Sequence, residues 1–227
     1  MLTSKKILPK IKAMMEDYAV ITYEQVGAVK VKWLQTREHV RRPPAKNAGW
    51  KPAKSGTTWG GDWMTGWFNG TFTVGKELRG QSLFLCARTG GRESLAWVNK
   101  EPRGILTRPG FNAKGSNHGE LLLTSSAVTG RRFEIDVEAY AWHPQPNTGP
   151  RDGDSGPRHH TFTSIDITAR REDVWALLMD MRTLMGLVDS LDDSSLRKNR
   201  IIRTFLKVYE ILPQLPAENP GDDPSQA

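Results

Sequence analysis

The chain has 227 residues, of which 37% are hydrophobic and 25% are charged, so its composition is that of a folded protein and excludes a disordered chain. Its single cysteine, Cys86, excludes a disulfide framework and a cysteine-based zinc site. No apolar run is long enough to span a membrane, and lysines interrupt the N-terminal segment where a signal peptide would be apolar. We therefore expect a cytoplasmic protein with no membrane partner.

The net charge of +7 raises the question whether the partner is a nucleic acid. Each basic cluster falls in a different predicted element: Arg41 with Arg42, Arg131 with Arg132, Arg170 with Arg171, and the run from Lys198 to Arg203. No helix with a basic stripe and no aromatic-rich RNA-binding pattern accompanies them. We interpret the excess charge as solvated surface and expect no nucleic-acid partner.

The first predicted segment comprises residues 1–36. Apolar residues recur at helical spacing over residues 1–20, and residues 28–34 alternate as a first strand would. Residues 37–58 are rich in proline, glycine, lysine and arginine, which predicts an extended linker strap rather than a core element.

Residues 59–169 form a series of short predicted strands separated by turn signals. The strands are expected at residues 67–74, 81–88, 94–98, 104–107, 120–124, 132–140 and 162–168. Alternating apolar residues such as Phe68 and Val137 are expected to face the core. Because no helical pattern separates the strands, and a parallel sheet needs crossover helices, the pattern predicts an antiparallel, jelly-roll-like β-sandwich.

The sequence pattern changes twice over the rest of the chain, from strands to a loop and then to helices. Residues 143–160 carry many prolines and glycines and are predicted as a loop. From residue 170 the apolar period becomes helical, so residues 170–213 are predicted as an αα-hairpin with a wide apolar face. Residues 214–227 are predicted as a disordered tail or interdomain linker. The predicted fold class is therefore mainly β, a sandwich with an N-terminal helix and a C-terminal αα-hairpin.

The aromatic run that opens the sandwich is the strongest candidate for a carbohydrate or domain contact, through Trp59, Asp62, Trp63 and Trp67. In one interpretation an indole ring stacks on a sugar while Asp62 binds hydroxyl groups. In the other, the rings pack at the edge of the sandwich. Three glycines make a helix unfavourable here, so we expect a loop that enters a strand, with Phe68 in the core and Trp67 on the opposite face.

The sequence favours no catalytic or metal-binding constellation. None of the histidines has a partner at ligand spacing: His39, His118, His143, His159 and His160. The segment from Asp152 to Gly156 departs from an EF-hand and is interpreted, with His159 and His160, as a solvated loop. There is no nucleophile elbow or P-loop, and Cys86 is interpreted as a buried, inert thiol. No glycosidase pair is favoured among the acidic candidates Glu93, Glu101, Glu120, Asp136, Glu138 and Asp166.

Three motifs stand in a characteristic order. Trp59 to Phe68 has the form W-G-x-x-W-x-T-x-W-F, Ala96 to Ile105 contains an N-x-E-P-x-G hairpin, and Val137 to Pro144 ends a strand as E-A-Y-A-x-H-P. This order resembles the N-terminal β-sandwich domain of glycoside hydrolase family 38 α-mannosidases, in which the hairpin usually has glycine where Lys100 stands. The predicted αα-hairpin also resembles the helices that lead into the catalytic domain of that family, so the resemblance covers about residues 59–213.

The resemblance implies that this chain has a non-catalytic role. In that family a catalytic domain follows, with a histidine–any–aspartate zinc pair and an aspartate nucleophile, and no histidine here is followed two places later by aspartate. We therefore expect no catalytic residue and no metal ligand in this chain, with zinc only in a catalytic domain that the chain lacks. The implied role is to pack on that domain, and the implied partners are the domain itself and a second copy of the chain.

Two alternatives stay open. The chain can be an autonomous carbohydrate-binding module that uses the cluster from Trp59 to Trp67. It can also be a small hydrolase whose acidic residues the sequence does not pair.

Overall fold

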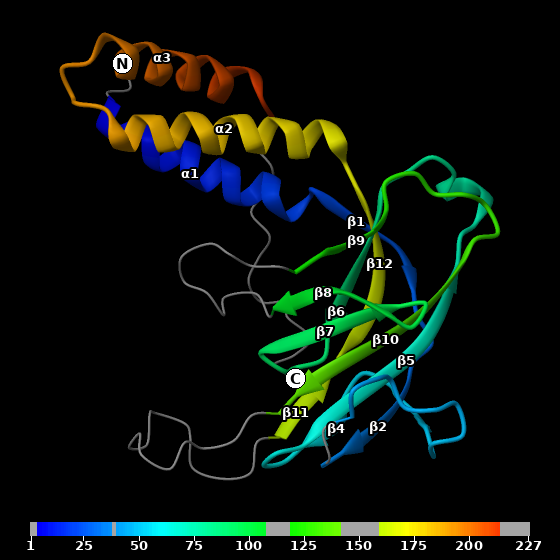
Figure 1. Cartoon of the computed structure of the whole chain (residues 1–227). Helices are drawn as coiled ribbons and strands as arrows, with labels where there is room; N and C mark the ends of the chain where they lie inside the picture. Colours follow the sequence, from blue (N-terminus) through cyan, green and yellow to red (C-terminus); the bar gives the residue numbers. More distant parts are fainter. Residues whose placement is uncertain (1–3, 38–39, 108–118, 142–158, 214–227) are drawn as a thin grey trace. The chain divides into compact units, whose positions relative to one another are not determined.

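The structure, a computed structural model, describes residues 4–37, 40–107, 119–141 and 159–213 (Figure 1). The chain divides into two compact units. Residues 25–169 form a β unit, and residues 1–24 together with residues 170–227 form a helical unit. Residues 1–36 are predicted from the sequence as one segment. In the structure, the helix Ser4–Val20 belongs to the helical unit and the strand Lys32–Thr36 to the β unit.

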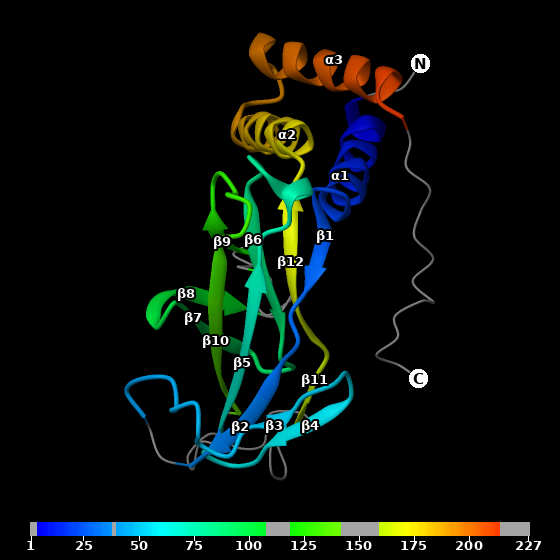
Figure 2. The same ribbon diagram turned by 90° about the vertical axis from the view of Figure 1, so that its right-hand side faces the viewer.

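The β unit contains a six-stranded sheet of order β3-β2-β5-β10-β7-β8, a four-stranded sheet of order β1-β12-β6-β9, and a two-stranded sheet of β4 and β11. The pairs β5–β10, β7–β10 and β6–β12 are antiparallel. Strands β2, β5 and β10 lie side by side in Figure 2. The strands are β1 Tyr23–Ala28, β2 Lys32–Thr36, β3 Lys51–Pro52, β4 Thr57–Gly60, β5 Thr65–Thr73, β6 Leu83–Arg88, β7 Glu93–Val98, β8 Glu101–Thr107, β9 Leu121–Thr124, β10 Arg132–Tyr140, β11 His159–Phe162 and β12 Ser164–Arg170.

One apolar core joins the two larger sheets. Phe68 of β5 and Val137 of β10 come from the six-stranded sheet, and Leu85 of β6 and Ile167 of β12 come from the four-stranded sheet. Successive strand residues point to opposite faces, so each sheet contributes one side to this core. The predicted fold class, a mainly β sandwich with antiparallel sheets accompanied by helices, is confirmed.

Two segments predicted as irregular contain short strands. The strap over residues 37–58 supplies β3 and the start of β4. The prediction that residues 143–160 form a loop is wrong at its C-terminal end, because His159 and His160 begin β11. The histidine at position 160 faces Trp59 in register, with ring centroids 5.0 Å apart. This ring contact and the ladder hydrogen bonds stabilise a strand that has no apolar alternation.

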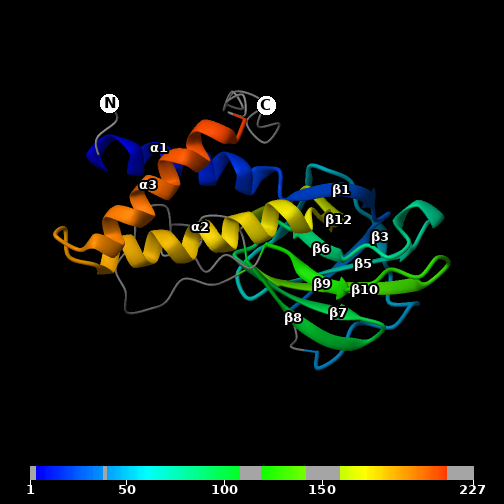
Figure 3. The ribbon, with the colours of Figure 1, turned by 90° about the horizontal axis from the view of Figure 1, so that it is seen from above.

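The helical unit consists of α1 Ser4–Val20, α2 Glu172–Ser190 and α3 Leu196–Ile211, and α3 lies across α1 and α2 (Figure 3). Ile11 of α1, Leu178 of α2 and Phe205 of α3 are buried in one apolar cluster. The hydroxyl of Tyr18 donates a hydrogen bond of 3.0 Å to the carbonyl of Pro213 and so ties α1 to the end of α3. The αα-hairpin of α2 and α3 is present, and α1 covers part of its apolar face.

A stripe of basic residues runs along one side of α3. Arg197, Arg200, Arg203 and Lys207 are all exposed and recur at spacings of three and four residues, which places them on one side of the helix. The prediction that no helix carries such a stripe is wrong. In the linear sequence, other residues stand between these cations, including the apolar pairs Ile201–Ile202 and Phe205–Leu206, and the stripe emerges only once the helix has defined bounds.

Candidate functional site

The loop between β4 and β5 holds most of the residues predicted as a carbohydrate or domain contact. It turns sharply, because Gly60 and Gly61 have φ values of 109° and 117° and Trp63 has a φ of 64°. The structure confirms a loop that enters a strand, but the strand begins at Thr65, two residues before the predicted start, and Trp59 belongs to β4. The four predicted residues occupy three different environments.

Trp59 lies in the core of the sandwich. Its Nε1 donates a buried hydrogen bond of 2.7 Å to the carbonyl of Thr89, and its ring meets Phe68 edge-on at a centroid distance of 5.6 Å. Gly66 makes this packing possible, since a Cβ at that position would lie 2.5 Å from the Trp59 ring. With 2% of its surface exposed, Trp59 presents no face to a ligand.

Trp67 lies on the side of the six-stranded sheet that faces away from the core, which we call the outer face. It pairs in register with Leu34 on one side and Glu138 on the other. Phe68 points to the core, as predicted from strand alternation. The Trp67 side chain is fully buried, and its Nε1 has no hydrogen-bond partner in the described part of the chain. Trp67 is therefore not available to stack on a ligand in this conformation.

Asp62 and Trp63 are the exposed members of the predicted set. Trp63 is 52% exposed, and Asp62 beside it is also at the surface. Burial raises the pKa of the Tyr140 phenol, and the negative charge of Asp62 raises it further. Tyr140, which ends β10 on the outer face, is not among the site residues predicted from the sequence. Tyr140 follows the buried Ala139 in a strand of alternating apolar residues, and this alternation could have predicted that Tyr140 lies on the outer face.

A buried carboxylate occupies the middle of the outer face. Asp136 is fully buried, and its Oδ1 accepts a hydrogen bond of 2.7 Å from Nδ2 of Asn69. Its Oδ2 lies 2.9 Å from Nζ of Lys100, which also pairs with Glu134 at 3.0 Å. These contacts join β5 and β10 to the turn between β7 and β8.

That turn explains how Lys100 reaches the carboxylates. Asn99 and Lys100 have φ values of 54° and 69°, the paired positive angles of a tight hairpin turn in which glycine is favoured. The side chain of Asn99 accepts a hydrogen bond of 2.9 Å from the backbone N–H of Glu134. Burial lowers the pKa of Lys100, but its hydrogen bonds to Asp136 and Glu134 outweigh this effect, so the pKa is raised overall.

A second polar cluster lies on the four-stranded sheet, on the side away from the core. Asp166 accepts hydrogen bonds from Arg88 at 2.8 Å, from Ser164 at 2.6 Å and from Gln25 at 3.0 Å. Cys86 lies near this cluster, and burial raises the pKa of its thiol, only partly offset by the positive charge of Arg88. The structure confirms the interpretation of Cys86 as a buried thiol.

The two buried acidic candidates, Asp136 and Asp166, therefore lie in different sheets. Asp136 is saturated by Lys100 and Asn69, and Asp166 by Arg88, Ser164 and Gln25, so each buried carboxylate holds strands together. Within the described ranges, no three histidine, cysteine, aspartate or glutamate side chains gather closely enough to hold a metal ion. None of the described helices has the length and apolar character that a membrane crossing requires. His39, His118, His143 and the segment from Asp152 to Gly156 lie outside the described residues.

Sequence comparison gives the class of protein that the chain resembles: it is similar to part of a glycoside hydrolase, and the similar stretch includes a β domain. Its curated relatives include α-mannosidase 2C1 of mouse (Mus musculus) and of human (Homo sapiens), each 24% identical over 78% of this chain. The chain spans only 17% of the length of each relative. No family model matches the chain.

Solved structures with a similar arrangement include β-glucuronidases. One, from glycoside hydrolase family 2, is 13% identical and has a TM-score of 0.42, covering 65% of this chain and 18% of its own. Another, from Ruminococcus gnavus in complex with D-glucaro-d-lactam, is 11% identical and has a TM-score of 0.44, covering 65% of this chain and 29% of its own. Similarities at this level assign no function to the chain.

Proposed function

We propose that the chain is the non-catalytic N-terminal domain of an α-mannosidase-like glycoside hydrolase, where it packs on and supports a catalytic domain. The observation that carries this proposal is the extent of the similarity to α-mannosidase 2C1. The aligned stretch of 184 residues exceeds the whole β unit of residues 25–169, so it includes part of the helical unit as well. The similarity therefore extends beyond the β unit, and it corresponds to one small part of a much larger enzyme.

The hydrogen bonds of the buried carboxylates favour a non-catalytic role for this chain. Asp136 and Asp166 each have a cation and further donors within hydrogen-bond distance. A glycosidase needs one carboxyl group that gives a proton to the leaving group and one that attacks or activates water. Carboxylates saturated by internal partners serve neither role. In the proposed enzyme, the catalytic domain supplies those groups and the zinc.

The proposal is tested with an antibody raised against the isolated chain. We expect this antibody to deplete hydrolysis of an aryl α-mannoside from an extract of cells that carry the gene, while the purified chain alone releases no product with or without added zinc. Pre-immune antibody is the control. Unchanged activity in the depleted extract, or zinc-dependent turnover by the purified chain, would refute the proposal. A cytoplasmic location, expected from the sequence, belongs to the same proposal and is checked by cell fractionation.

The exposed pair Asp62 and Trp63 favours a second candidate function, carbohydrate binding by the chain itself. An exposed indole beside a carboxylate is the arrangement that stacks on a pyranose ring and accepts hydrogen bonds from its hydroxyl groups. A glycan array with the isolated chain tests this function, with Trp63→Ala as the matched variant. The function predicts a glycan signal that this variant abolishes, and an array without signal contradicts it.

A further inference from the structure

A polar pocket of about 310 Å³ opens over β2, β5 and β10 in the β unit. Its lining combines basic, aromatic and uncharged polar residues: Lys30, Lys32, Lys46, Trp50, Asn69, Gly70, Thr71, Arg132 and Glu134. From the sequence alone, these basic residues are expected to be solvated surface. The pocket brings together residues from four separate stretches of the chain, so linear clustering could not reveal it.

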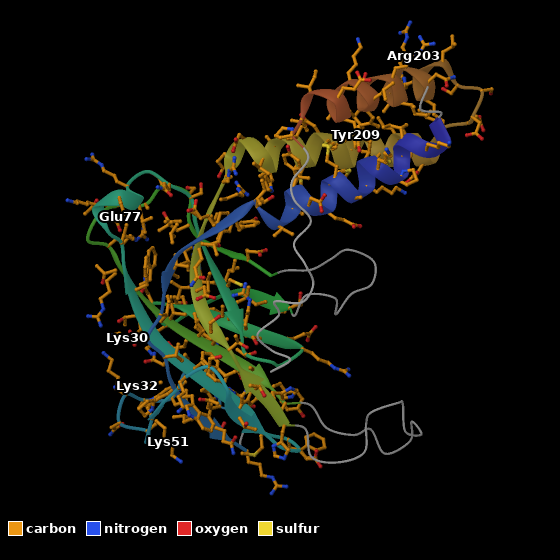
Figure 4. The ribbon with its side chains drawn as sticks, turned by 180° about the vertical axis from the view of Figure 1, so that it is seen from behind. Lys30, Lys32, Lys51, Glu77, Arg203 and Tyr209 are labelled. Carbon is orange, nitrogen blue, oxygen red and sulfur yellow. The ribbon has the colours of Figure 1, made fainter. Side chains whose placement is uncertain are left out.

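The pocket has an excess of positive charge with no internal counterpart. Lys30, Lys32, Lys46 and Arg132 are exposed, and across the described ranges none of them forms an ion pair or a side-chain hydrogen bond. Lys30 and Lys32 follow one another along the same edge of the β unit in Figure 4. The only acidic residue of the lining, Glu134, already pairs with Lys100 at 3.0 Å. Four cations therefore face one carboxylate, which shares the cation Lys100 with the buried Asp136.

Backbone packing brings these cations together. Gly70 allows the chain at Lys30 to cross β5 closely, because a Cβ on Gly70 would lie 2.7 Å from the carbonyl oxygen of Lys30. Lys32 then pairs in register with Asn69, which directs its side chain to the outer face with Asn69 and Thr71. The placement of Lys32 follows from this register, whereas Lys46 comes from the segment between β2 and β3.

An aromatic wall of the pocket is also fixed. Trp50 is half-buried, and its Nε1 donates a hydrogen bond of 2.8 Å to the carbonyl of Ala45. The indole N–H is thereby satisfied within the protein, and the ring remains as an apolar surface beside the cations. Asn69 and Thr71 add uncharged hydrogen-bonding groups.

We infer that this pocket binds a phosphorylated monosaccharide. A phosphate monoester carries close to two negative charges at neutral pH and has three strong acceptor oxygens, which suits several unpaired lysine and arginine side chains better than a single carboxylate does. Trp50 stacks on the sugar ring, and its hydroxyl groups bind the Thr71 hydroxyl and the Oδ1 of Asn69, whose Nδ2 is held by Asp136. The volume lies at the lower end of the range of about 300–1,000 Å³ for small-molecule sites, which favours one sugar unit. The sugar part of this inference rests on the proposed function, whereas the phosphate part rests on the charges alone.

Calorimetric titration of the isolated full chain tests the inference with three probes: mannose 6-phosphate, inorganic phosphate and mannose. We expect mannose 6-phosphate to bind, inorganic phosphate to bind about tenfold more weakly, and mannose to give no heat. Lys32→Gln and Arg132→Gln should each weaken mannose 6-phosphate binding by about tenfold, the loss expected for one charge-assisted hydrogen bond. Trp50→Leu should reduce it to the level of inorganic phosphate, while Trp50→Phe, which keeps a ring, should retain more of it.

Lys51→Gln is the matched control, because Lys51 is an exposed lysine next to Trp50 that does not line the pocket (Figure 4). The inference would be overturned if neither mannose 6-phosphate nor inorganic phosphate bound. It would also be overturned if Lys51→Gln weakened binding as much as the pocket variants do. Equal affinity for inorganic phosphate and mannose 6-phosphate would overturn the assignment of the sugar. Tighter binding of an RNA oligonucleotide, lost in the same variants, would identify a nucleic-acid surface instead. The titration uses no catalytic domain, so its result is independent of the antibody depletion that tests the proposed function.

Discussion

Gly66 and Trp59 form a matched pair in which the absence of a side chain on one makes room for the ring of the other. The Trp59 ring is 2% exposed, and a methyl group on Gly66 would lie 2.5 Å from it. The ring cannot move away without breaking its hydrogen bond to Thr89. The glycine in the aromatic motif is therefore a packing requirement of the sandwich core.

We predict that Gly66→Ala destabilises the protein by about 1–3 kcal/mol, the usual cost of forcing extra volume into a packed core. Thermal or urea unfolding measures this change. Gly186→Ala is the control, since a Cβ on Gly186 in α2 meets nothing within 4 Å and alanine is the better helix former. It should leave stability unchanged or raise it. A Gly66→Ala variant as stable as the wild type would show that Trp59 is not held where the structure has it.

Lys100 adopts a backbone conformation that favours glycine, at a φ of 69°, yet its side chain neutralises the buried Asp136. We predict that both Lys100→Gln and Lys100→Gly destabilise the protein. Lys100 is 41% exposed and Asn69 still binds Asp136 in the variants, so we expect about 1–3 kcal/mol rather than the larger cost of a fully buried pair. Unfolding of Lys100→Gly decides the question: a more stable variant would mean that backbone relaxation outweighs the ion pair.

The dependence of this effect on pH has a defined direction. The pKa of Lys100 is raised in the folded protein, so the folded state holds the proton more tightly than the unfolded state. The stability from this lysine is complete below the ordinary lysine pKa of 10.5 and is lost as the pH rises through the raised value. The difference in stability between the wild type and Lys100→Gly should therefore stay constant through the neutral range and narrow only above 10.5.

At the scale of elements, the strands were more predictable than the contacts across them. The alternation of apolar residues in β10 places Val137 in the core, as predicted, together with Phe133, Ile135 and Ala139. The short strand β11 was missed, because its residues are polar and its stability comes from pairing with β4 rather than from its own pattern.

The candidate site was only partly predictable from the sequence, because part of it depends on contacts between residues that are distant in the chain. The turn from Trp59 into β5 could be anticipated from its glycines, and the opposite orientations of Trp67 and Phe68 from the strand period. The burial of Trp59 could not, since it depends on Gly66 and on the carbonyl of Thr89, which is distant in sequence. The cationic pocket likewise depends on which strands lie next to each other.

The two aromatic residues Phe68 and Trp63 provide a test of the placement of β5 and the loop before it. Phe68 is fully buried and stacks on Phe162 at a centroid distance of 4.9 Å, whereas Trp63 is 52% exposed. We predict a loss of about 3–5 kcal/mol for Phe68→Ala. Trp63→Ala should cost less than about 1 kcal/mol, as is usual at the surface. Melting temperatures of the two variants measure this contrast, and equal losses would mean that the loop tryptophan belongs to the core.

At the scale of the whole molecule, the helical unit offers apolar side chains for association. Leu187 of α2 is 39% exposed, and Leu196 and Ile211 of α3 are each 79% exposed. We predict that the isolated chain associates with itself at high concentration through these side chains, because association removes apolar surface from water. Light scattering coupled to gel filtration measures the mass, and the double variant Leu196→Gln with Ile211→Gln should shift it toward the monomer. A strictly monomeric wild type at high concentration would contradict the prediction.

The division of the helical unit between the two ends of the sequence has a consequence for the order of events during synthesis. Ile7, Ile11 and Met14 of α1 are buried in the apolar cluster completed by α2 and α3, but α2 begins only at Glu172. About 150 residues separate the two helices, and at a synthesis rate of about 5–20 residues per second α1 leaves the ribosome roughly 8–30 s before its partners are made. During that interval its apolar face has no partner from α2 or α3, and a holdase chaperone can bind it. The strands of the β unit are all synthesised within the same interval, so the sandwich can close before the helical cluster forms.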